Sequence, residues 1–523
     1  MAQIPPDTAP SKIPRQESAL EKLFGKELDI TIFYFVITLT VPFLLLGAFW
    51  PDVLTGIGNR SLSLVCKLFK STYLLSVTGF VVFGIAIALS PFGRVRLGKD
   101  TDKPDFSTLS WFSMLFSAGM GIGLIFWSIA EPMYHFAAPP TGAAATPRAA
   151  ALSIEIFFFH WGFHAWGTFV IVGLSMAYFQ FRKGQPALIS RCLAPLIGER
   201  RALGGVGRVV DTFAIWATIL GVVTSLGLGA MQITGGISET LGVPGGSATT
   251  AVVIGLITCC FVFSAITGIE RGIQFLSLLN ISLMAILFSA FLLFGPTGHL
   301  FGVFGRGIAD YLTDLPRLSF STTLFGNEGW TRSWTVFYWA WWIAWAPFVG
   351  AFIARISKGR TIREFVLGVL VAPPLFSFIF ATAMGGTALH LDMAQGAGIG
   401  AVVKRDVAMA LFATLRHLPG YTFLAIVAVA LIASFFITSA DSATYVVTRF
   451  STQGLDPSDR RAGMRLTIVW GLILGLLAIV LIFSGGLKAL QTASIVGALP
   501  FLFIMLMCAA AIVVDLVRNE GSS

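Results

Sequence analysis

Long apolar stretches alternate with short polar ones along the whole chain. Twelve of them are long enough to cross a membrane as helices, which takes about 20 mostly apolar residues each. They lie at about 30–50, 70–92, 108–136, 150–181, 209–238, 247–268, 272–295, 331–356, 363–389, 420–450, 464–484 and 487–515. The pattern predicts an all-α membrane protein whose two termini lie on the same side, because the number of crossings is even.

Composition supports this class and excludes most others. Of the 523 residues, 56% are hydrophobic and only 12% are charged, whereas soluble domains carry about 25% charged residues. The net charge of +9 does not indicate nucleic-acid binding, since Lys and Arg of membrane proteins gather in cytoplasmic loops. With the N-terminus inside, 24 of the 35 Lys and Arg residues fall on cytoplasmic segments. Both termini are therefore expected in the cytoplasm, in a multi-pass protein of the inner (cytoplasmic) membrane.

The layout of the stretches suggests a duplicated organisation. We expect a mobile cytoplasmic tail (1–29), two extra helices with a loop (30–107), a five-helix repeat (108–295), an amphipathic interfacial connection (296–330), a second five-helix repeat (331–515) and a short tail (516–523). The tail has no apolar core typical of a signal peptide. The five cysteines show no metal-ligand or disulfide spacing, so we expect them to be small core residues; they are Cys66, Cys192, Cys259, Cys260 and Cys508.

The stretch from Ser333 to Arg355 is unusually rich in aromatic residues. Positions three and four apart share a helix face, which groups Tyr338, Trp341, Trp342 and Trp345. Ring faces without a carboxylate among them suit a cation whose charge is buried in methyl groups. The alternative is an interfacial belt of Trp and Tyr. Depth argues against a belt, because Trp345 lies about 16 Å along the helix from Trp334 at 1.5 Å per residue.

Two features predict interruptions of helices within the membrane. Pro347 follows the aromatic block and removes a backbone donor, and interrupted helices at mid-membrane are where transporters bind substrate. In the third stretch Gly119, Gly121 and Gly123 alternate with larger residues, ahead of Glu131 and Pro132. These glycines suit either close helix packing or an unwound segment whose carbonyl groups can bind Na⁺.

Two further polar groups lie in apolar stretches. Thr438 and Ser439 either bond back to their own helix or, with the Phe435 carbonyl, complete an oxygen cage; Asp441 beside them is interpreted as a structural or gating residue.

In the fourth stretch, Trp161 and Phe169 share a face and can close an aromatic box from the side opposite Trp341. His160 and His164 have a zinc-like spacing, but they lack a third ligand on their face, which favours packing histidines. Thr218, in the fifth stretch, is interpreted as a packing residue.

The sequence resembles the betaine/choline/carnitine transporter family. The resemblance rests on Trp334-Thr335 with the tryptophans through Trp342, on GMGIG at 119–123, on Glu131-Pro132, on His160-Trp161 and on TSADS at 438–442. It implies a leucine-transporter-like inverted repeat of two five-helix units preceded by two N-terminal helices. It also implies assembly as a homotrimer.

The resemblance also implies binding residues. Substrate contacts would come from Trp161, Phe169, Trp341, Trp342, Trp345, Gly121 and Gly123. A Na⁺ site would be formed by Ser117, Ala118, Met120, Phe435, Thr438 and Ser439. A second Na⁺ site would use Thr218 and Phe348, although Val222 replaces a threonine there. The fifth stretch lacks the Arg that replaces the ion in sodium-independent exchangers of the family, which favours Na⁺ as the coupling ion, with no other cofactor.

Gly123 bears on the substrate, because choline carriers of the family tend to have an acidic residue there. We therefore expect Na⁺-coupled uptake of a betaine-type zwitterion: glycine betaine, dimethylsulfoniopropionate or ectoine. The alternative is a choline or carnitine carrier of the same fold, proton-coupled or exchanging. An enzyme or receptor is disfavoured, because the stretches contain no set of nucleophile and base or of metal ligands. No catalytic residues and no nucleic-acid partner are expected.

Overall fold

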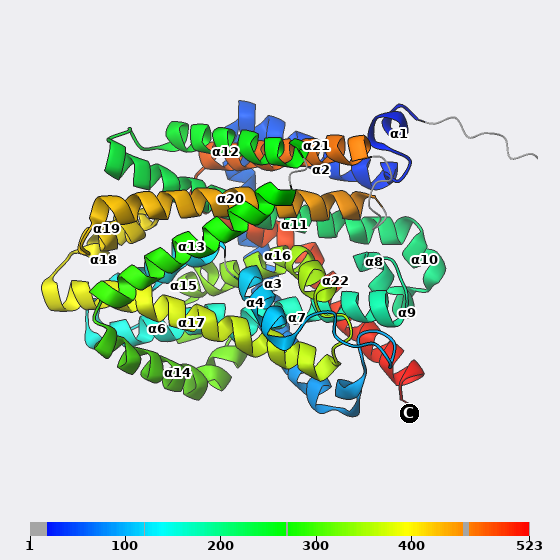
Figure 1. The fold of residues 1–523 in the computed structure, drawn as a ribbon, viewed down its shortest axis with the longest axis horizontal. Helices are drawn as coiled ribbons and strands as arrows, with labels where there is room; N and C mark the ends of the chain where they lie inside the picture. The colour runs from blue at the N-terminus through cyan, green and yellow to red at the C-terminus, as the bar shows by residue number, and fades with distance from the viewer. Residues whose placement is uncertain (1–17, 120, 268–269, 453–459, 522–523) are drawn as a thin grey trace, which may run out of the picture.

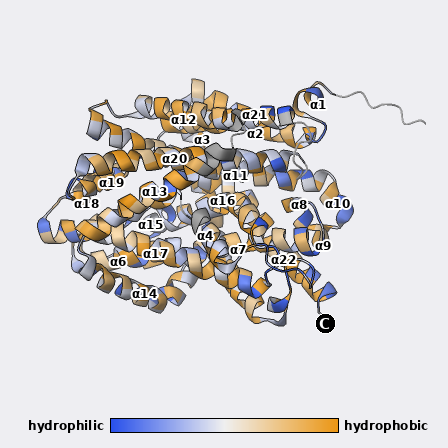
Figure 2. Cartoon of the chain, in the orientation of Figure 1, coloured by the Kyte–Doolittle hydropathy of each residue, from blue (hydrophilic) through white to orange (hydrophobic). Residues whose placement is uncertain are grey.

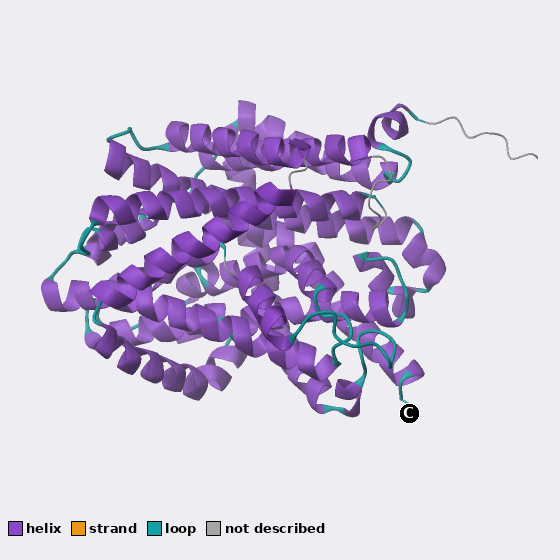
Figure 3. Cartoon of the chain, viewed as in Figure 1, coloured by secondary structure: helices purple, strands orange, loops and turns teal. Residues whose placement is uncertain are grey.

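The computed structural model describes residues 18–119, 121–267, 270–452 and 460–521, and these form helices joined by short loops (Figure 3). No strand occurs in these ranges, which contain a single isolated antiparallel bridge between Arg96 and Thr361. Eleven helical segments of the described chain are long and apolar enough to cross a membrane. The prediction of an all-α membrane protein is confirmed.

The first half of the chain contains the following helices: α1 (Ala19–Phe24), α2 (Ile30–Phe49), α3 (Pro51–Leu89), η1 (Pro91–Arg94), α4 (Thr108–Gly119), α5 (Ile122–Ala137), α6 (Pro147–Trp161), α7 (Phe163–Ala177), the π-helical η2 (Tyr178–Arg182), α8 (Ile189–Cys192), α9 (Ala194–Ile197), α10 (Glu199–Leu203), α11 (Gly205–Leu241), α12 (Ser247–Thr267) and α13 (Glu270–Phe294).

The second half continues with α14 (Thr297–Phe320), η3 (Leu324–Gly326), α15 (Glu328–Ser333), α16 (Thr335–Arg355), α17 (Ile362–Gln395), α18 (Ile399–Arg405), η4 (Val407–Met409), α19 (Ala410–Leu415), α20 (Tyr421–Ser451), α21 (Arg460–Phe483) and α22 (Leu487–Asn519). Of the expected tail, residues 1–17 lie outside the described residues, and residues 19–24 form the short helix α1.

The third expected crossing is divided into two helices. α4 has 12 residues and α5 has 16, so neither alone spans a bilayer, and the described spans number eleven rather than the expected twelve. Gly121 has extended backbone angles (φ −157°, ψ −178°) between them. The helix interruption predicted from the glycine pattern is therefore present.

The fourth expected crossing is also broken, which the sequence did not predict. α6 ends and α7 begins at Gly162 (φ −90°, ψ −136°). A Cβ atom there would lie 2.4 Å from the Phe158 carbonyl oxygen and 2.7 Å from the Tyr311 hydroxyl. That hydroxyl instead accepts a hydrogen bond from the Phe163 N–H at 3.1 Å. Because Gly162 has no side chain, Tyr311 of α14 can approach the break and accept the hydrogen bond from the Phe163 N–H.

The interruption expected at Pro347 is absent, and that prediction is wrong. α16 continues through Pro347 to Arg355. Buried helices tolerate proline because neighbouring groups and small adjustments satisfy the freed carbonyl. The irregular backbone lies instead at Trp334 (φ −114°, ψ −72°), between α15 and α16.

The cysteine prediction is correct for three of the five residues. Cys66, Cys192 and Cys508 are buried, whereas Cys259 and Cys260 are exposed. The outer face of α12 also exposes apolar side chains such as Leu256 and Phe263. In a membrane protein such a face is covered by lipid or by a partner, so apolar character does not imply burial within the chain.

Most long helices run side by side, and α16 lies at their centre, packed against α7, α11 and α22 (Figure 1). Helix α14 covers α6 and α17. Hydrophobic residues dominate the middle of the molecule, and hydrophilic residues gather toward its left and right ends (Figure 2). α1 and the end of α22 lie at the same, right-hand end (Figure 1).

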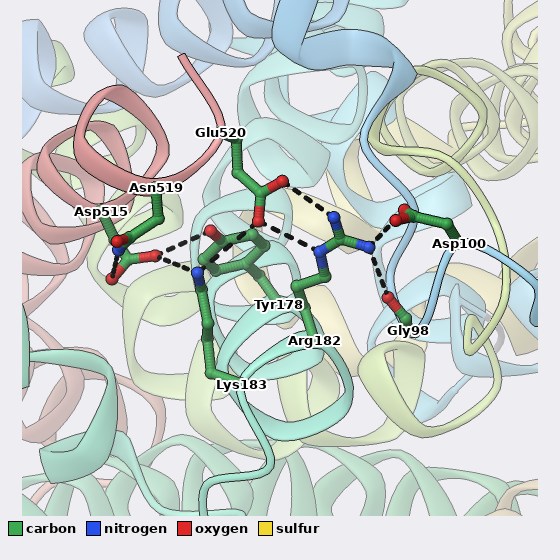
Figure 4. Close-up of polar contacts among 8 residues, drawn as sticks. All are labelled: Gly98, Asp100, Tyr178, Arg182, Lys183, Asp515, Asn519 and Glu520. Carbon is green, nitrogen blue, oxygen red and sulfur yellow. Dashed lines mark hydrogen bonds and ion pairs between the residues drawn. The ribbon is translucent and has the colours of Figure 1, made fainter. Parts of the chain in front are cut away.

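An ion cluster joins the end of α22 to neighbouring segments of the chain (Figure 4). The Arg182 guanidinium donates to Glu520 at 2.8 Å and to Asp100 at 2.5 Å, while Lys183 lies 3.0 Å from Asp515. The hydrogen bonds from Arg182 lower the pKa of Glu520. The cluster therefore links α22, η2 and the loop that follows η1.

Candidate substrate cavity

The aromatic residues of α16 are buried inside the protein. Trp341 is 1% exposed and Trp342 is 7% exposed, because α7, α11 and α22 surround this helix. The rings of Trp341 and Trp342 stack with centroids 4.9 Å apart, and Trp161 meets Trp342 edge-on at 4.8 Å. Phe169 approaches Trp342 edge-on at 6.1 Å. The rings thus face one another within the helix bundle.

The indole N–H groups of these rings are already used by the protein. Trp342 donates to the His160 carbonyl at 3.0 Å, and Trp345 donates to the Gly221 carbonyl at 2.9 Å. Trp341 also points its N–H at Gly221, at 3.4 Å. These tryptophans therefore present ring faces, rather than hydrogen-bond donors, to the cavity. Such a lining suits a methylated cation.

A cavity of about 1770 Å³ is lined by all seven expected substrate residues. We use the name aromatic cage for five of them: Trp161, Phe169, Trp341, Trp342 and Trp345. The other two, Gly121 and Gly123, belong to the start of α5. The structure thus brings together residues from α5, α6, α7 and α16 that lie far apart in the sequence.

The cavity reaches the end of the molecule that carries both described chain ends. Asp105 and Arg355 line it there, and both side chains are exposed. Tyr338, near the start of α16, lies 17 residues before Arg355, or about 25 Å at 1.5 Å per residue. Beyond the cage, Trp330 and Trp334 are 8% exposed and pack on His135 with ring centroids at 5.3 and 4.4 Å. Neither tryptophan is in the described lining of the cavity.

Gly123 allows the cage to close against α5. A Cβ atom at this position would lie 2.6 Å from Cη2 of Trp341 and 3.4 Å from Cη2 of Trp161. Any side chain here would displace a ring of the cage. Gly121, in contrast, has open space around a Cβ.

The expected Na⁺ residues are only partly described. Ser117 and Ala118 belong to the last turn of α4, where side chains are not described, and Met120 lies outside the described residues. Phe435, Thr438 and Ser439 of α20 line the same cavity as Gly121.

The Thr438 hydroxyl donates to carbonyls of its own helix, with distances of 3.1 Å to Ser434 and 3.2 Å to Phe435. It accepts a hydrogen bond from the Asn280 amide of α13 at 3.2 Å. The sequence reasoning missed Asn280, a cavity residue with no recognisable motif around it. Asp441 lines the cavity one turn further along.

The residues expected at a second Na⁺ site are less suited to one. Phe348 lines the cavity and meets Trp345 edge-on at 5.4 Å. Thr218 is fully buried in α11 and donates to the Ala214 carbonyl at 2.8 Å. It is absent from the described lining of the cavity.

A buried carboxylate lies directly behind the cage, and its partners were not predicted. Oε2 of Glu131 accepts hydrogen bonds from the Trp161 indole at 3.1 Å and from the Tyr338 hydroxyl. Oε1 of Glu131 lies 2.6 Å from Nδ1 of His160, whose Nε2 lies 2.9 Å from the Thr335 hydroxyl. His160 was expected to be a packing residue, but it also joins Glu131 and Thr335 in a hydrogen-bond network.

Glu131, His135 and His160 place ligand atoms within 4.8 Å of one another, as a metal site would. However, Nδ1 of His135 accepts from the Trp330 indole at 3.3 Å, which leaves the proton on Nε2, the nitrogen facing Glu131. A metal ion would have to displace that proton, so the cluster suits a hydrogen-bond network better. His164 stacks on Trp339 at 5.1 Å, away from this group.

Comparison with known proteins agrees with this geometry. The model of the betaine/carnitine/choline transporter family matches residues 31–521. The chain belongs to the betaine/carnitine/choline transporter family. It is thus a multi-pass membrane transporter and not an enzyme.

Relatives within the betaine/carnitine/choline family differ in the substrate that their names give. The chain is 45% identical to a probable glycine betaine transporter of Desulfitobacterium hafniense (strain Y51), over 91% of this chain and 96% of that protein. It is 41% identical to an ectoine/hydroxyectoine transporter of Virgibacillus pantothenticus, over 94% and 97%. It is 40% identical to the osmo-independent choline transporter BetT1 of Acinetobacter baylyi (strain ATCC 33305 / BD413 / ADP1), over 85% of each chain.

Proposed function

We propose that this transporter takes up a betaine-type zwitterion together with Na⁺. The observation that carries the proposal is the cage of ring faces beside the first turn of α5. Each ring face attracts a methylated ammonium group by about 0.5–2 kcal/mol. The trimethylammonium head of glycine betaine, or the dimethylsulfonium head of its sulfur analogue, fits such a lining.

The start of α5 favours a zwitterion over a plain cation. Its cap residue, Gly121, offers no side-chain acceptor to the first N–H groups of the helix, and Gly121 and Gly123 both line the cavity. A helix N-terminus carries a partial positive charge that stabilises an anion by about 0.3–1 kcal/mol. The carboxylate of betaine benefits from this charge, whereas choline has no anionic group to place there.

The coupling ion is proposed from the two segments that meet the cavity beside the cage. The break between α4 and α5 frees backbone carbonyl groups, which are ligands suited to Na⁺. Phe435, Thr438 and Ser439 add a carbonyl and two hydroxyls from α20. We propose no second ion at Thr218 and Phe348, because Thr218 is absent from the described lining of the cavity.

The same proposal covers the wider organisation. Residues 108–295 and 331–515 would be inverted five-helix repeats, and each begins with an interrupted crossing, α4–α5 and α15–α16. The basic loops at the mouth of the cavity would lie in the cytoplasm, on the inner face of the cell membrane. The cavity then faces inward, and the working unit is a homotrimer.

Uptake into proteoliposomes tests the function. Labelled glycine betaine should accumulate under an inward Na⁺ gradient and should not accumulate when K⁺ replaces Na⁺. Accumulation that persists without Na⁺ would rule out sodium coupling. Preferential accumulation of labelled choline would replace this proposal with the choline carrier suggested by the relative in Acinetobacter.

A further inference from the structure

We propose that Glu131 is the positioning residue that gives the aromatic cage its preference for a positively charged head group. This inference deepens the proposed function and rests on it. Glu131 lies on α5 and is fully buried, yet it does not line the cavity. It therefore acts through the rings rather than by touching the substrate.

The first support is the convergence of donors on one carboxylate. The Trp161 indole N–H can only donate, and it meets Oε2 at 3.1 Å together with the Tyr338 hydroxyl. Nδ1 of His160 meets Oε1 at 2.6 Å. Three donors from α6 and α16 thus bind one acceptor, which fits an ionised carboxylate.

The second support is the position of two of these donors relative to the cage. Trp161 lines the cavity, and Tyr338 stacks on Trp342 with centroids 5.9 Å apart. Hydrogen bonds to one carboxylate fix the tilt of both rings at once. A shift of Glu131 would therefore move both Trp161, a wall of the cage, and Tyr338, the ring stacked on Trp342.

The third support is the charge balance behind the cage. Nδ1 of His135 accepts from Trp330, so this ring is neutral, and its Nε2 lies 3.6 Å from Glu131. His160 faces the Glu131 carboxylate through Nδ1 at 2.6 Å and the Thr335 hydroxyl through Nε2 at 2.9 Å. Glu131 thus places its carboxylate directly behind the ring faces, and among the described residues only these two histidines, and no Lys or Arg, pair with it.

A charge in this place has a specific consequence. Ring faces alone attract a cation, but they also bind an apolar group of the same shape. A fixed negative charge in a poorly screened interior attracts only the charged head group. Glu131 should therefore separate trimethylammonium from tert-butyl, two groups of nearly equal size.

The test compares glycine betaine with 3,3-dimethylbutanoate, which has carbon in place of nitrogen, by equilibrium binding to the purified full chain. Glu131→Gln should weaken betaine binding by about tenfold or more, while binding of 3,3-dimethylbutanoate should change less than about threefold. The matched control Tyr338→Phe keeps the charge and the ring but removes one donor. It should leave the ratio of the two affinities within about threefold of wild type.

The outcomes separate the two proposals. If wild-type protein does not bind betaine, the proposed function is wrong and this inference fails with it. If wild type binds betaine but Glu131→Gln weakens both ligands equally, only the role of Glu131 is contradicted. If Glu131→Gln is not monodisperse, the ratio of the two affinities is measured in Glu131→Asp and Tyr338→Phe instead. Both retain the charge, and loss of the affinity ratio in either one overturns the inference.

Discussion

The indole N–H of Trp342 donates to the main-chain carbonyl of His160 at 3.0 Å. This bond joins the central helix α16 to the last turn of α6, two residues before the break at Gly162. It holds the ring face of Trp342 toward Trp161 and leaves no free donor on that indole. The orientation of the cage thus depends on contacts between helices that are distant in sequence.

Removing a cage ring should lower affinity more than removing an equally large ring outside the cage. Trp342→Leu or Trp345→Leu should weaken betaine binding by about tenfold or more, since each removes a cation–π contact. Trp334→Leu is the control, because Trp334 is buried against Trp127 and Tyr134 and does not line the described cavity. Binding is measured by isothermal titration. Equal losses in all three variants would contradict the cage.

A side chain at position 123 should disturb the cage, and one at position 121 should not. Gly123→Ala places a methyl group 2.6 Å from Trp341, so the ring must move and betaine affinity should fall by about tenfold. Gly121→Ala meets no protein atom within 4 Å and has extended angles that alanine adopts readily, so it should leave the rings in place and weaken binding less than Gly123→Ala. Titration of both variants with betaine measures this difference. The interpretation fails if Gly123→Ala retains wild-type affinity.

The dependence of uptake on sodium should change with the hydroxyls of α20. Thr438→Ala and Ser439→Ala each remove one oxygen that we assign to Na⁺. The Na⁺ concentration for half-maximal uptake should therefore rise by about tenfold, with a smaller effect on binding of betaine at saturating Na⁺. Thr444→Ala is the matched control, because this hydroxyl on the same helix bonds only to the carbonyls of Ala440 and Asp441 among the described residues. An equal rise in the control would contradict the assignment.

The ion cluster at the end of α22 should stabilise the protein in a pH-dependent way. Arg182 lowers the pKa of Glu520 in the folded state. Its contribution is therefore present above the unfolded pKa, about 4.3, and is lost as the pH falls through the folded value. Glu520→Gln should lower the thermal midpoint at pH 7 by an amount equivalent to about 1 kcal/mol or less.

Thermal unfolding of Glu520→Gln and wild type at two pH values checks this prediction. The difference should shrink as the pH falls from about 4.3 through the lowered pKa of Glu520, because the wild-type carboxylate then becomes protonated as well. Asp100→Asn serves as the control, since Asp100 pairs with the same Arg182 but is 80% exposed. A difference between Glu520→Gln and wild type that is the same at both pH values would contradict the electrostatic origin.

Local patterns in the sequence predicted much of the helix arrangement and the cage. The i, i+3 and i, i+4 spacing placed Trp341, Trp342 and Trp345 in one lining, and the glycine pattern predicted the break before α5. Helical periodicity and glycine content are properties of neighbouring residues, so they can be read without knowing the fold.

Other features depend on the packing of distant helices. Pro347 was expected to break α16, but the surrounding helices keep it continuous. The break at Gly162 depends on Tyr311, which comes from α14. Glu131 acquires its role from His160 and Tyr338, on two other helices. No local pattern contains such contacts, and only the assembled structure shows them.

The most direct measurement is a structure of the protein determined with glycine betaine and Na⁺. Its ammonium nitrogen should lie within about 6 Å of the ring centroids of Trp161, Trp341 and Trp342, with the carboxylate toward the first turn of α5. Betaine bound elsewhere in the molecule, or these indoles turned outward to the lipid with the cavity between them lost, would contradict the account.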